Sequence, residues 1–255
     1  MRMSNQFEFN PCFVVPVYNH GKPLPAVVNH LRQYRLPCLL IDDGSAPDCA
    51  AVIETIVRQE PWTSVLTHDQ NCGKGAAIKT GLRNAKARGY SHLFQIDADG
   101  QHQLDDVPRF LEQARKHPYC VIIGQPVFDQ SIPRIRYYSR YLTHIWVWIN
   151  TVSFKLKDTM CGFRIYPVSI VCDYVNHHHT GDHMEFDIEI LVKLFRQQVC
   201  IESLLTSVNY PEDGVSHFRF CKDNALISRM HAGLFCSLFT SYFPQLLKRR
   251  LIIHK

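Results

Sequence analysis

Two carboxylates stand at the end of an apolar segment near the middle of the chain. Residues 92–96 are predicted to form a buried strand, and Asp97 and Asp99 follow it with a single residue between them. In extended backbone, alternate side chains point to the same side, so both carboxylates face one way. Gln101 adds an amide oxygen, and hard divalent cations prefer such oxygen ligands. The stretch suits a divalent metal site that keeps positions open for phosphate oxygens, and it equally suits a solvated turn.

The elements around this stretch alternate between short apolar runs and helical patterns. Strands are predicted at residues 9–17, 38–41, 62–67, 92–96 and 120–124, with a helical pattern after each of the first four. Such alternation predicts an α/β fold with a mostly parallel, Rossmann-like sheet flanked by helices. Three of the strands end in the polar motifs P-V-Y-N, D-D-G-S and D-A-D-G-Q. Because ligands bind at the carboxyl ends of parallel strands, these motifs are expected to meet in one crevice.

The second half of the chain is less regular. An Arg- and aromatic-rich helix is expected from Tyr137, followed by a loop and short strand at 158–167, a helix at 184–196 and a strand at 199–210. An apolar helix at 231–243 precedes a Lys-Arg-Arg cluster. We expect a main domain at 1–215 and a C-terminal helical extension at 216–255, made of a lid segment and an apolar, basic helix.

Composition limits the function classes. The chain has 255 residues, 46% of them hydrophobic, and a net charge of +5, which favours anionic ligands or a membrane surface over nucleic acid. No signal peptide and no membrane-spanning segment is recognised. The ten cysteines are scattered without a C-x-x-C pair, which predicts free, buried thiols in a reducing compartment. We therefore expect a cytoplasmic protein, or one at the cytoplasmic face of a membrane that residues 231–255 contact.

A second group of carboxylates lies in the segment M-E-F-D-I-E. On a helix, Glu185 and Glu189 share a face, whereas Asp187 points roughly to the opposite side, toward apolar positions. A carboxylate on an apolar face needs a partner or a function. Asp187 is therefore the first candidate for a general base, and Glu185 is the second.

Taken together and in order, six motifs resemble those of family 2 glycosyltransferases. They are P-V-Y-N, D-D-G-S, N-x-G-K-G-A, D-A-D-G-Q-H, D-x-x-C-G-F-R and F-D-I-E, and they extend over residues 10–215. The chain is most similar to the branch of dolichyl-phosphate mannose and glucose synthases and bacterial polyprenyl-phosphate enzymes. The resemblance implies a GT-A fold, a UDP- or GDP-linked sugar donor, a divalent metal (Mg²⁺ or Mn²⁺) and inversion at the anomeric carbon. It also implies a hexosyltransferase whose acceptor is a lipid phosphate or another hydrophobic molecule.

The same resemblance assigns roles to particular residues. By this resemblance, Tyr18 is expected to stack on the base of the nucleotide and Asp43 to accept a hydrogen bond from the base or the ribose. Asp158 is expected to contact the sugar hydroxyls and is a further catalytic candidate. The implied nucleotide-sugar-binding residues are Pro16, Tyr18, Asn19, Asp42, Asp43, Lys74, Asp97, Ala98, Arg164 and His217, and the implied metal ligands are Asp97, Asp99 and Gln101. Arginines are expected to clamp phosphates, with Arg164 supported by its motif and Arg134, Arg136 and Arg140 by their composition alone.

Departures and rival functions follow from the same residues. Position 20 is His where many relatives carry Glu, which puts that ligand contact in doubt. The loop before the third helical pattern contains Gly73 and Lys74 but lacks the P-loop motif G-x-x-x-x-G-K-[ST], because Gly75 and then Ala76 follow the lysine. This argues against a P-loop ATPase.

Two rival functions are considered. The first rival is a sugar-phosphate nucleotidyltransferase, whose Gly-rich signature near the first strand is missing. The second is a catalytically silent nucleotide-sugar-binding protein, against which the intact carboxylates argue. The sugar, the base and the acceptor stay open.

Overall fold

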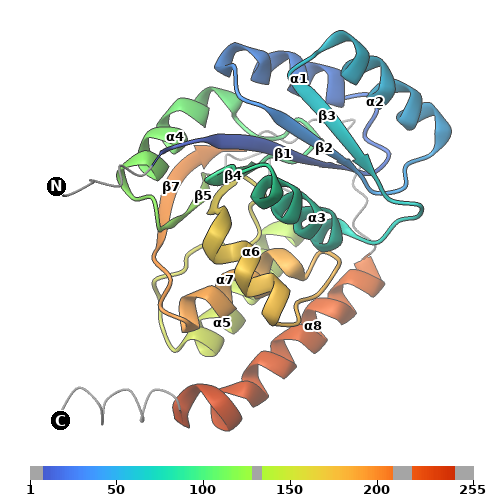
Figure 1. The fold of residues 1–255 in the computed structure, drawn as a ribbon. Helices are drawn as coiled ribbons and strands as arrows, with labels where there is room; N and C mark the ends of the chain where they lie inside the picture. Colours follow the sequence, from blue (N-terminus) through green and yellow to red (C-terminus); the bar gives the residue numbers. More distant parts are fainter. Residues whose placement is uncertain (1–7, 128–133, 209–219, 245–255) are drawn as a thin grey trace, which may run out of the picture.

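The computed structural model describes residues 8–127, 134–208 and 220–244. One seven-stranded sheet runs through the centre, with helices on both faces (Figure 1). Its strands are β1 (Pro11–Val17), β2 (Cys38–Asp42), β3 (Thr63–Thr67), β4 (His92–Gln95), β5 (Val121–Val127), β6 (Arg164–Pro167) and β7 (Ile201–Ser207). They lie in the order β3-β2-β1-β4-β6-β5-β7, and β6 alone runs antiparallel to its neighbours β4 and β5. The α/β class and the mostly parallel sheet are thus confirmed.

The strand order reverses between β1 and β4. From β1 the chain extends the sheet through β2 to β3, and then returns to place β4 on the other side of β1. In open α/β sheets, ligands bind outside the carboxyl ends of the strands at such a reversal. The motifs P-V-Y-N and D-A-D-G-Q lie at these two strand ends. The topology therefore predicts where the site lies before any side chain is considered.

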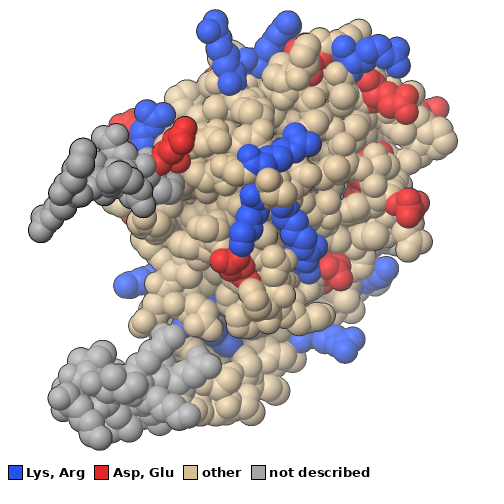
Figure 2. Space-filling model, viewed as in Figure 1, with Lys and Arg blue, Asp and Glu red and all other residues tan. Residues whose placement is uncertain are grey.

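Apolar helix faces cover the sheet on both sides. One layer holds α1 (Leu24–Leu31), α2 (Pro47–Gln59) and α4 (Val107–Lys116), and its core includes Leu24, Ile53 and Phe110. The other holds α3 (Lys74–Ala87), α6 (Val168–His177), α7 (Phe186–Arg196) and α5 (Arg134–Thr151), and its core includes Ile78, Val171 and Leu191. Short 3₁₀ turns at Arg32–Tyr34 and Leu104–Asp106 follow α1 and precede α4. On the surface of the second layer, Lys86 of α3 pairs with Asp173 of α6. Figure 2 shows basic and acidic side chains next to each other on this face of the molecule.

Two helices differ from their prediction. No helix is predicted where α6 lies, although the buried positions Val168, Val171, Cys172 and Val175 follow the helical period. The C-terminal helix α8 begins at Phe220 rather than at 231, runs to Ser237 and continues as a π turn over Leu238–Tyr242. It packs on the second layer, where Arg196 of α7 donates to the carbonyl of Leu234 at 2.8 Å. The predicted boundary at residue 215 lies outside the described residues.

Among the described residues, none of the helices combines the length and the apolar character that crossing a bilayer requires.

The predicted state of the cysteines is wrong for one pair. Cys120 and Cys200 form a disulfide. Cys120 immediately precedes β5 and Cys200 immediately precedes β7. These two strands pair in parallel with Val121 opposite Ile201, and the pairing places the two cysteines next to each other. A separation of 80 residues carries no sequence signal for such pairing. The structure therefore weakens the argument for a reducing compartment, while Cys12, Cys38, Cys49, Cys161 and Cys172 are free and buried as expected.

Reducing this disulfide is expected to lower the free energy of unfolding by about 2–4 kcal/mol, because the cross-link restricts a long loop in the unfolded chain. Urea denaturation with and without a thiol reductant measures the effect. The double variant Cys120→Ser, Cys200→Ser should match the reduced protein, and Cys72→Ser, which removes an exposed free thiol, should not. Identical denaturation midpoints in the oxidised and reduced proteins would contradict the expectation.

His231 of α8 makes the stability depend on pH. Its ring is buried, accepts at Nδ1 from Nδ2 of Asn150 at 3.2 Å and stacks on Trp146. Burial lowers the pKa of His231 to about 4, and burial likewise lowers the pKa of His92 to about 4 although its bond to the Pro118 carbonyl opposes this.

Because the unfolded imidazoles take up protons at higher pH than the folded ones, the contribution of these two histidines to stability should be flat above about pH 6.5 and fall as the pH drops toward 4. Each histidine contributes at most about 3 kcal/mol to this loss. Urea denaturation of the wild type and of His231→Gln at pH 7.5 and pH 5 measures it, and the variant should lose less stability than the wild type between these two pH values. Equal pH dependence in the variant and the wild type would contradict the assignment to His231.

Candidate active site

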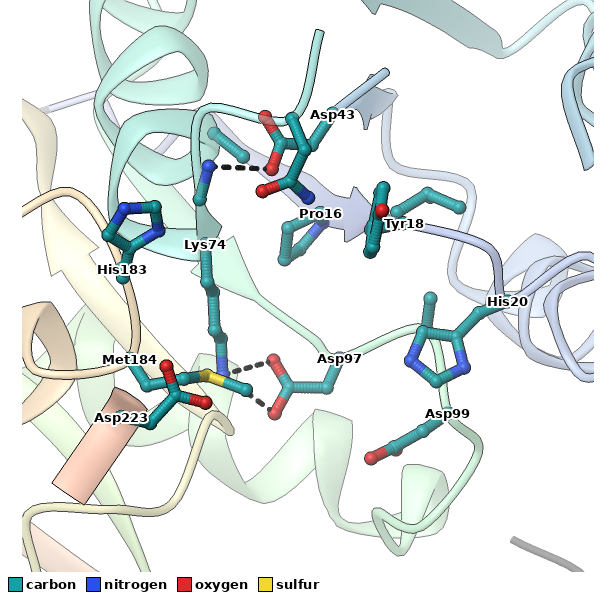
Figure 3. A pocket seen from close by; sticks show the side chains of 15 residues that line it. Pro16, Tyr18, His20, Asp43, Lys74, Asp97, Asp99, His183, Met184 and Asp223 are labelled. Carbon is teal, nitrogen blue, oxygen red and sulfur yellow. Dashed lines mark hydrogen bonds and ion pairs between the residues drawn. The ribbon is translucent and has the colours of Figure 1, made fainter. Parts of the chain in front are cut away.

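A cavity of about 430 Å³ opens at the carboxyl ends of β1, β2 and β4 (Figure 3). The predicted residues that line it are Pro16, Tyr18, Asp43, Lys74, Asp97, Ala98 and Asp99. They come from three strand ends and from the first residue of α3, so the expected convergence on one crevice is observed. Asn71 and Gly73 add the loop before α3, and His20 lines the cavity beside Tyr18.

Asp43 both lines the cavity and holds a loop. Its Oδ1 accepts from the backbone N–H of Cys72 at 2.9 Å and lies 2.7 Å from Nδ1 of His68, and its Oδ2 accepts from the N–H of Gly73 at 2.8 Å. Nε2 of His68 contacts the hydroxyl of Thr80 on α3 at 2.9 Å. The carboxylate thus ties the end of β2 to the start of α3 as well as facing the ligand space.

Asn19 and Asp42 occupy a different place from the one the resemblance implied. The side-chain oxygen of Asn19 accepts from the N–H of Ala46 at 2.7 Å, and Oδ1 of Asp42 accepts from the N–H of Ser45 at 2.9 Å. The hydroxyl of Ser45 accepts in turn from the N–H of Asn19 at 3.0 Å. These bonds stabilise the turn that leads into α2, so Asn19 and Asp42 hold the loop next to the cavity without lining it themselves.

Gly73 allows the loop before α3 to approach the rest of the protein closely. Its φ is +103°, a conformation that L-residues rarely adopt, and a Cβ there would collide with the carbonyl of Asp182 and the ring of His183. The glycine places Lys74 at the first position of α3, with its side chain directed across the cavity (Figure 3).

Lys74 joins two carboxylates. Its Nζ lies 2.8 Å from Oδ1 and 3.0 Å from Oδ2 of Asp97, and 2.8 Å from Oδ2 of Asp187. Burial opposes the charged form, yet the two carboxylates raise the pKa of Lys74 above its ordinary value. Burial similarly opposes ionisation of Asp97, but Lys74 and His102 lower the pKa of that carboxyl well below its ordinary value. Lys74 and Asp97 therefore both stay charged at neutral pH.

The predicted metal ligands are partly assembled. Asp97 and Asp99 both line the cavity, and Oδ1 of Asp99 accepts from the backbone N–H of Gln101 at 3.0 Å. Gly162 of the C-G-F-R motif packs so closely on Asp97 that any Cβ there would collide with its carboxylate. Two hard carboxylates fit Mg²⁺ or Mn²⁺, with further ligands left to phosphate oxygens or water.

Other groups of potential ligands lie elsewhere. In the described parts of the chain, the groups of three or more His, Cys, Asp or Glu ligand atoms are Asp43–His68–Cys72 and His117–Cys120–Glu202. The second includes a disulfide-bonded cysteine.

Asp187 has the buried, partnered position that its place on an apolar helix face predicted. It is 5% exposed and contacts Lys74, Nε2 of Gln95 at 3.3 Å and Nη1 of Arg164 at 3.5 Å. Glu185 instead accepts from the N–H of His183 at 3.3 Å, outside the cavity lining. Of the two candidates, the structure connects Asp187 more directly to the cavity, through Lys74.

The phosphate clamp expected of Arg164 does not fit its position. The side chain is fully buried and donates to the carbonyls of Cys161 at 2.5 Å, Thr159 at 2.7 Å and Asp187 at 2.7 Å. Nη1 also donates to the hydroxyl of Tyr166 at 3.1 Å. With its N–H groups committed to the protein, Arg164 holds the C-G-F-R loop and α7 together instead of facing a ligand.

Asp158 likewise serves the protein interior. Its carboxylate forms a bidentate pair with Arg140 at 2.6 and 2.8 Å and accepts from the N–H groups of Met160 and Cys161. Burial opposes ionisation, but Arg140 and the other donors lower the pKa of Asp158 below its ordinary value. A direct role in catalysis is therefore not supported for Asp158, nor phosphate binding for Arg140.

Some site predictions cannot be placed, and other site residues were missed. His217 lies outside the described residues, as do the side chains of Arg134 and Arg136. His183, Met184 and Asp223 line the cavity without having been assigned to it. Met184 carries a weak signal because it precedes F-D-I-E. Asp223 carries none, since the long helix α8 brings it to the cavity from a distant part of the chain (Figure 3).

Comparison with known proteins gives the family. The model of "Glycosyl transferase family 2" matches residues 12–173, more than half of the chain. An uncharacterized protein, MJ0544, from Methanocaldococcus jannaschii is 26% identical over 211 residues, which cover 80% of this chain and 90% of that protein. The polyprenol monophosphomannose synthase of Mycolicibacterium smegmatis is 30% identical over 184 residues, which cover 71% of this chain and 63% of that enzyme. The dolichyl-phosphate beta-glucosyltransferase of Dictyostelium discoideum is 25% identical over 222 residues, which cover 78% of this chain and 65% of that enzyme. The matched region thus spans less than two thirds of each of these two enzymes.

Solved structures agree on the fold. Glucosyl-3-phosphoglycerate synthase of M. tuberculosis superposes with a TM-score of 0.66 at 13% identity, covering 89% of this chain and 80% of that one. The mannosyltransferase PcManGT of Pyrobaculum calidifontis, in complex with GDP-Man and Mn²⁺, superposes with a TM-score of 0.56 at 11% identity, covering 98% and 82%. With the sheet order, the strand-end cavity and the family match in agreement, the chain belongs to glycosyltransferase family 2 and has the GT-A fold.

Proposed function

We propose that this glycosyltransferase moves a hexose from a UDP- or GDP-linked donor to a lipid phosphate, with a divalent metal and inversion at the anomeric carbon. The observation that carries the proposal is the cavity at the reversal of strand order. There Tyr18, Asp43, Lys74, Asp97 and Asp99 surround one space. An aromatic ring, a base-reading carboxylate, a cation and two metal-type carboxylates are the groups that a nucleoside diphosphate sugar requires.

The names of the relatives support the hexose and the acceptor. Similar proteins include a polyprenol monophosphomannose synthase and dolichyl-phosphate glucosyltransferases. A structural neighbour binds GDP-Man and Mn²⁺. Two different hexoses and two different prenyl carriers occur among them, so the class of reaction is better supported than the particular sugar.

In this function the cavity divides into two regions. Pro16, Tyr18 and Asp43 lie on one side, where Tyr18 stacks on the base and Asp43 accepts from the base or ribose (Figure 3). Lys74 and Asp97 lie across from them and face the diphosphate. A metal ion held by Asp97 and Asp99 would neutralise the charge that develops on the leaving diphosphate.

The transfer itself needs one displacement. An oxygen of the acceptor phosphate attacks the anomeric carbon, the bond from that carbon to the diphosphate oxygen breaks, and the electron pair leaves with the nucleoside diphosphate. A single displacement inverts the configuration. A lipid phosphate is already ionised, so Asp187 need not remove a proton and can instead orient Lys74; with a hydroxyl acceptor, Asp187 would take the proton.

The test is transfer of labelled hexose from UDP-glucose and GDP-mannose to a polyprenyl phosphate in detergent, with Mn²⁺ or Mg²⁺. We expect a lipid-linked product of opposite anomeric configuration to the donor, measured by NMR. Release of pyrophosphate from a nucleoside triphosphate and a sugar phosphate would identify a nucleotidyltransferase. Nucleotide binding with neither transfer nor slow donor hydrolysis would identify a silent binding protein, and either result would refute the proposal.

Contact with a membrane is part of the proposal because the acceptor is a lipid. Exposed apolar side chains gather where α5 meets α8, and Trp146 contacts Phe235 edge to face. Leu142, Phe154 and Phe239 are also largely exposed. This surface begins on residues earlier than the predicted contact at 231–255, whose last part lies outside the described residues.

A further inference from the structure

Lys74 places a positive charge directly on the carboxylate that the proposed function assigns to a metal. Its ammonium lies within 3.0 Å of both oxygens of Asp97. The third short contact, to Asp187 at 2.8 Å, holds the ammonium on the side of the cavity toward α7. Lys74 is therefore the counter-ion of Asp97.

A divalent cation and this ammonium compete for the same oxygens. Two positive charges a few ångström apart in a partly buried site repel each other strongly even at an intermediate dielectric constant. His102, whose Nε2 lies 3.4 Å from Oδ2 of Asp97, occupies a further side of the carboxylate. A metal that arrives alone must therefore displace Lys74 without offering it another anion.

We propose that Lys74 is a built-in counter-ion that keeps metal affinity low until the donor diphosphate binds. The diphosphate supplies the anionic partner to which Lys74 shifts, and this shift releases the oxygens of Asp97 for the metal. Metal and nucleotide then bind cooperatively because each removes an obstacle to the other. The inference rests on the metal-dependent function proposed above and adds the order in which its charges are exchanged.

The surroundings permit this exchange without leaving a bare buried charge. The Lys74 side chain is 17% exposed, begins directly after the cavity-lining Gly73, and has a flexible stem that moves more easily than an arginine fork. When Lys74 leaves Asp187, that carboxylate keeps Gln95 at 3.3 Å and Arg164 at 3.5 Å. Arg164 also donates to the backbone carbonyl of Asp187 at 2.7 Å, so its position does not depend on Lys74.

The experiment measures binding of Mn²⁺ alone, without nucleotide, by electron paramagnetic resonance of the free ion. Lys74→Gln should bind Mn²⁺ at least about tenfold more tightly than the wild type, because the competing charge is removed. Lys74→Arg should stay weak. Lys86→Gln is the matched control, since Lys86 lies on the same helix and also pairs with an aspartate, Asp173, but on the surface. Lys74→Met, which keeps the length of the side chain, repeats the test if the glutamine variant does not fold.

The inference is wrong if the neutral variants bind Mn²⁺ no more tightly than the wild type. A second titration keeps this failure distinct from failure of the proposed function. If the wild type binds UDP or GDP with Mn²⁺ while Lys74→Gln shows no gain for Mn²⁺ alone, the function stands and the counter-ion role falls. If the wild type binds neither nucleotide with Mn²⁺, the proposed function is wrong, and the inference that rests on it falls with it.

Discussion

Replacing Asp97 with asparagine is expected to lower the rate of hexosyl transfer at least about 10³-fold. Asp97 contacts Lys74, faces the cavity and abuts Gly162 of the C-G-F-R motif. Its replacement removes a proposed metal ligand and one of the two carboxylate partners of Lys74 together. Steady-state transfer to a polyprenyl phosphate at saturating Mn²⁺ measures the effect.

Asp105→Asn is the matched control for this change. Asp105 belongs to the same acidic stretch, but its side chain is 71% exposed and forms an ion pair with His30, at 3.2 Å, away from the cavity lining. It should keep nearly wild-type activity. Thermal melting shows whether the Asp97 variant is folded. Transfer by a folded Asp97→Asn protein within about tenfold of the wild type would contradict the role assigned to this carboxylate.

Asp187→Asn is expected to lower transfer about 10²-fold while the affinity for the nucleoside diphosphate changes by less than about threefold. The reason is its position, since Asp187 contacts Gln95 and Arg164 and reaches the cavity-lining residues through Lys74. Transfer kinetics and calorimetric titration of the free nucleotide, measured on the same preparation, separate the two effects.

Asp173→Asn serves as the control for Asp187, because both carboxylates pair with lysines of α3, but only the lysine partner of Asp187, Lys74, lines the cavity. The control should leave transfer unchanged. If Asp187→Asn weakens nucleotide binding as much as it slows transfer, a role of Asp187 that is confined to the transfer step is contradicted.

The sequence predicts the fold and the centre of the site because both depend on strong local signals. Apolar runs ending in acid mark strand ends, and a parallel sheet brings those ends to one edge. Tyr18, Asp43, Lys74, Asp97 and Asp99 were accordingly predicted and do line the cavity. The apolar face of α7 likewise predicted the burial of Asp187.

The direction of a side chain is harder to predict than its type. Arg164 and Asp158 belong to a recognised motif, yet their hydrogen bonds are made within the protein, because a buried loop must satisfy its own carbonyl and N–H groups. The Cys120–Cys200 pair and the approach of Asp223 to the cavity join distant segments. No spacing or periodicity in the chain encodes such long-range contacts.

Calorimetric titration of UDP and GDP, each with and without Mn²⁺, on the wild type and on Asp99→Ala is the most direct test of the central claim. We predict tight binding of one nucleotide that depends on Mn²⁺ and is lost in Asp99→Ala, since Asp99 lines the cavity beside Asp97. Absence of binding by both nucleotides in the presence of Mn²⁺ would contradict the claim that this cavity is a nucleotide-sugar site. Binding that is unchanged in Asp99→Ala would contradict the claim that its paired carboxylates hold a metal.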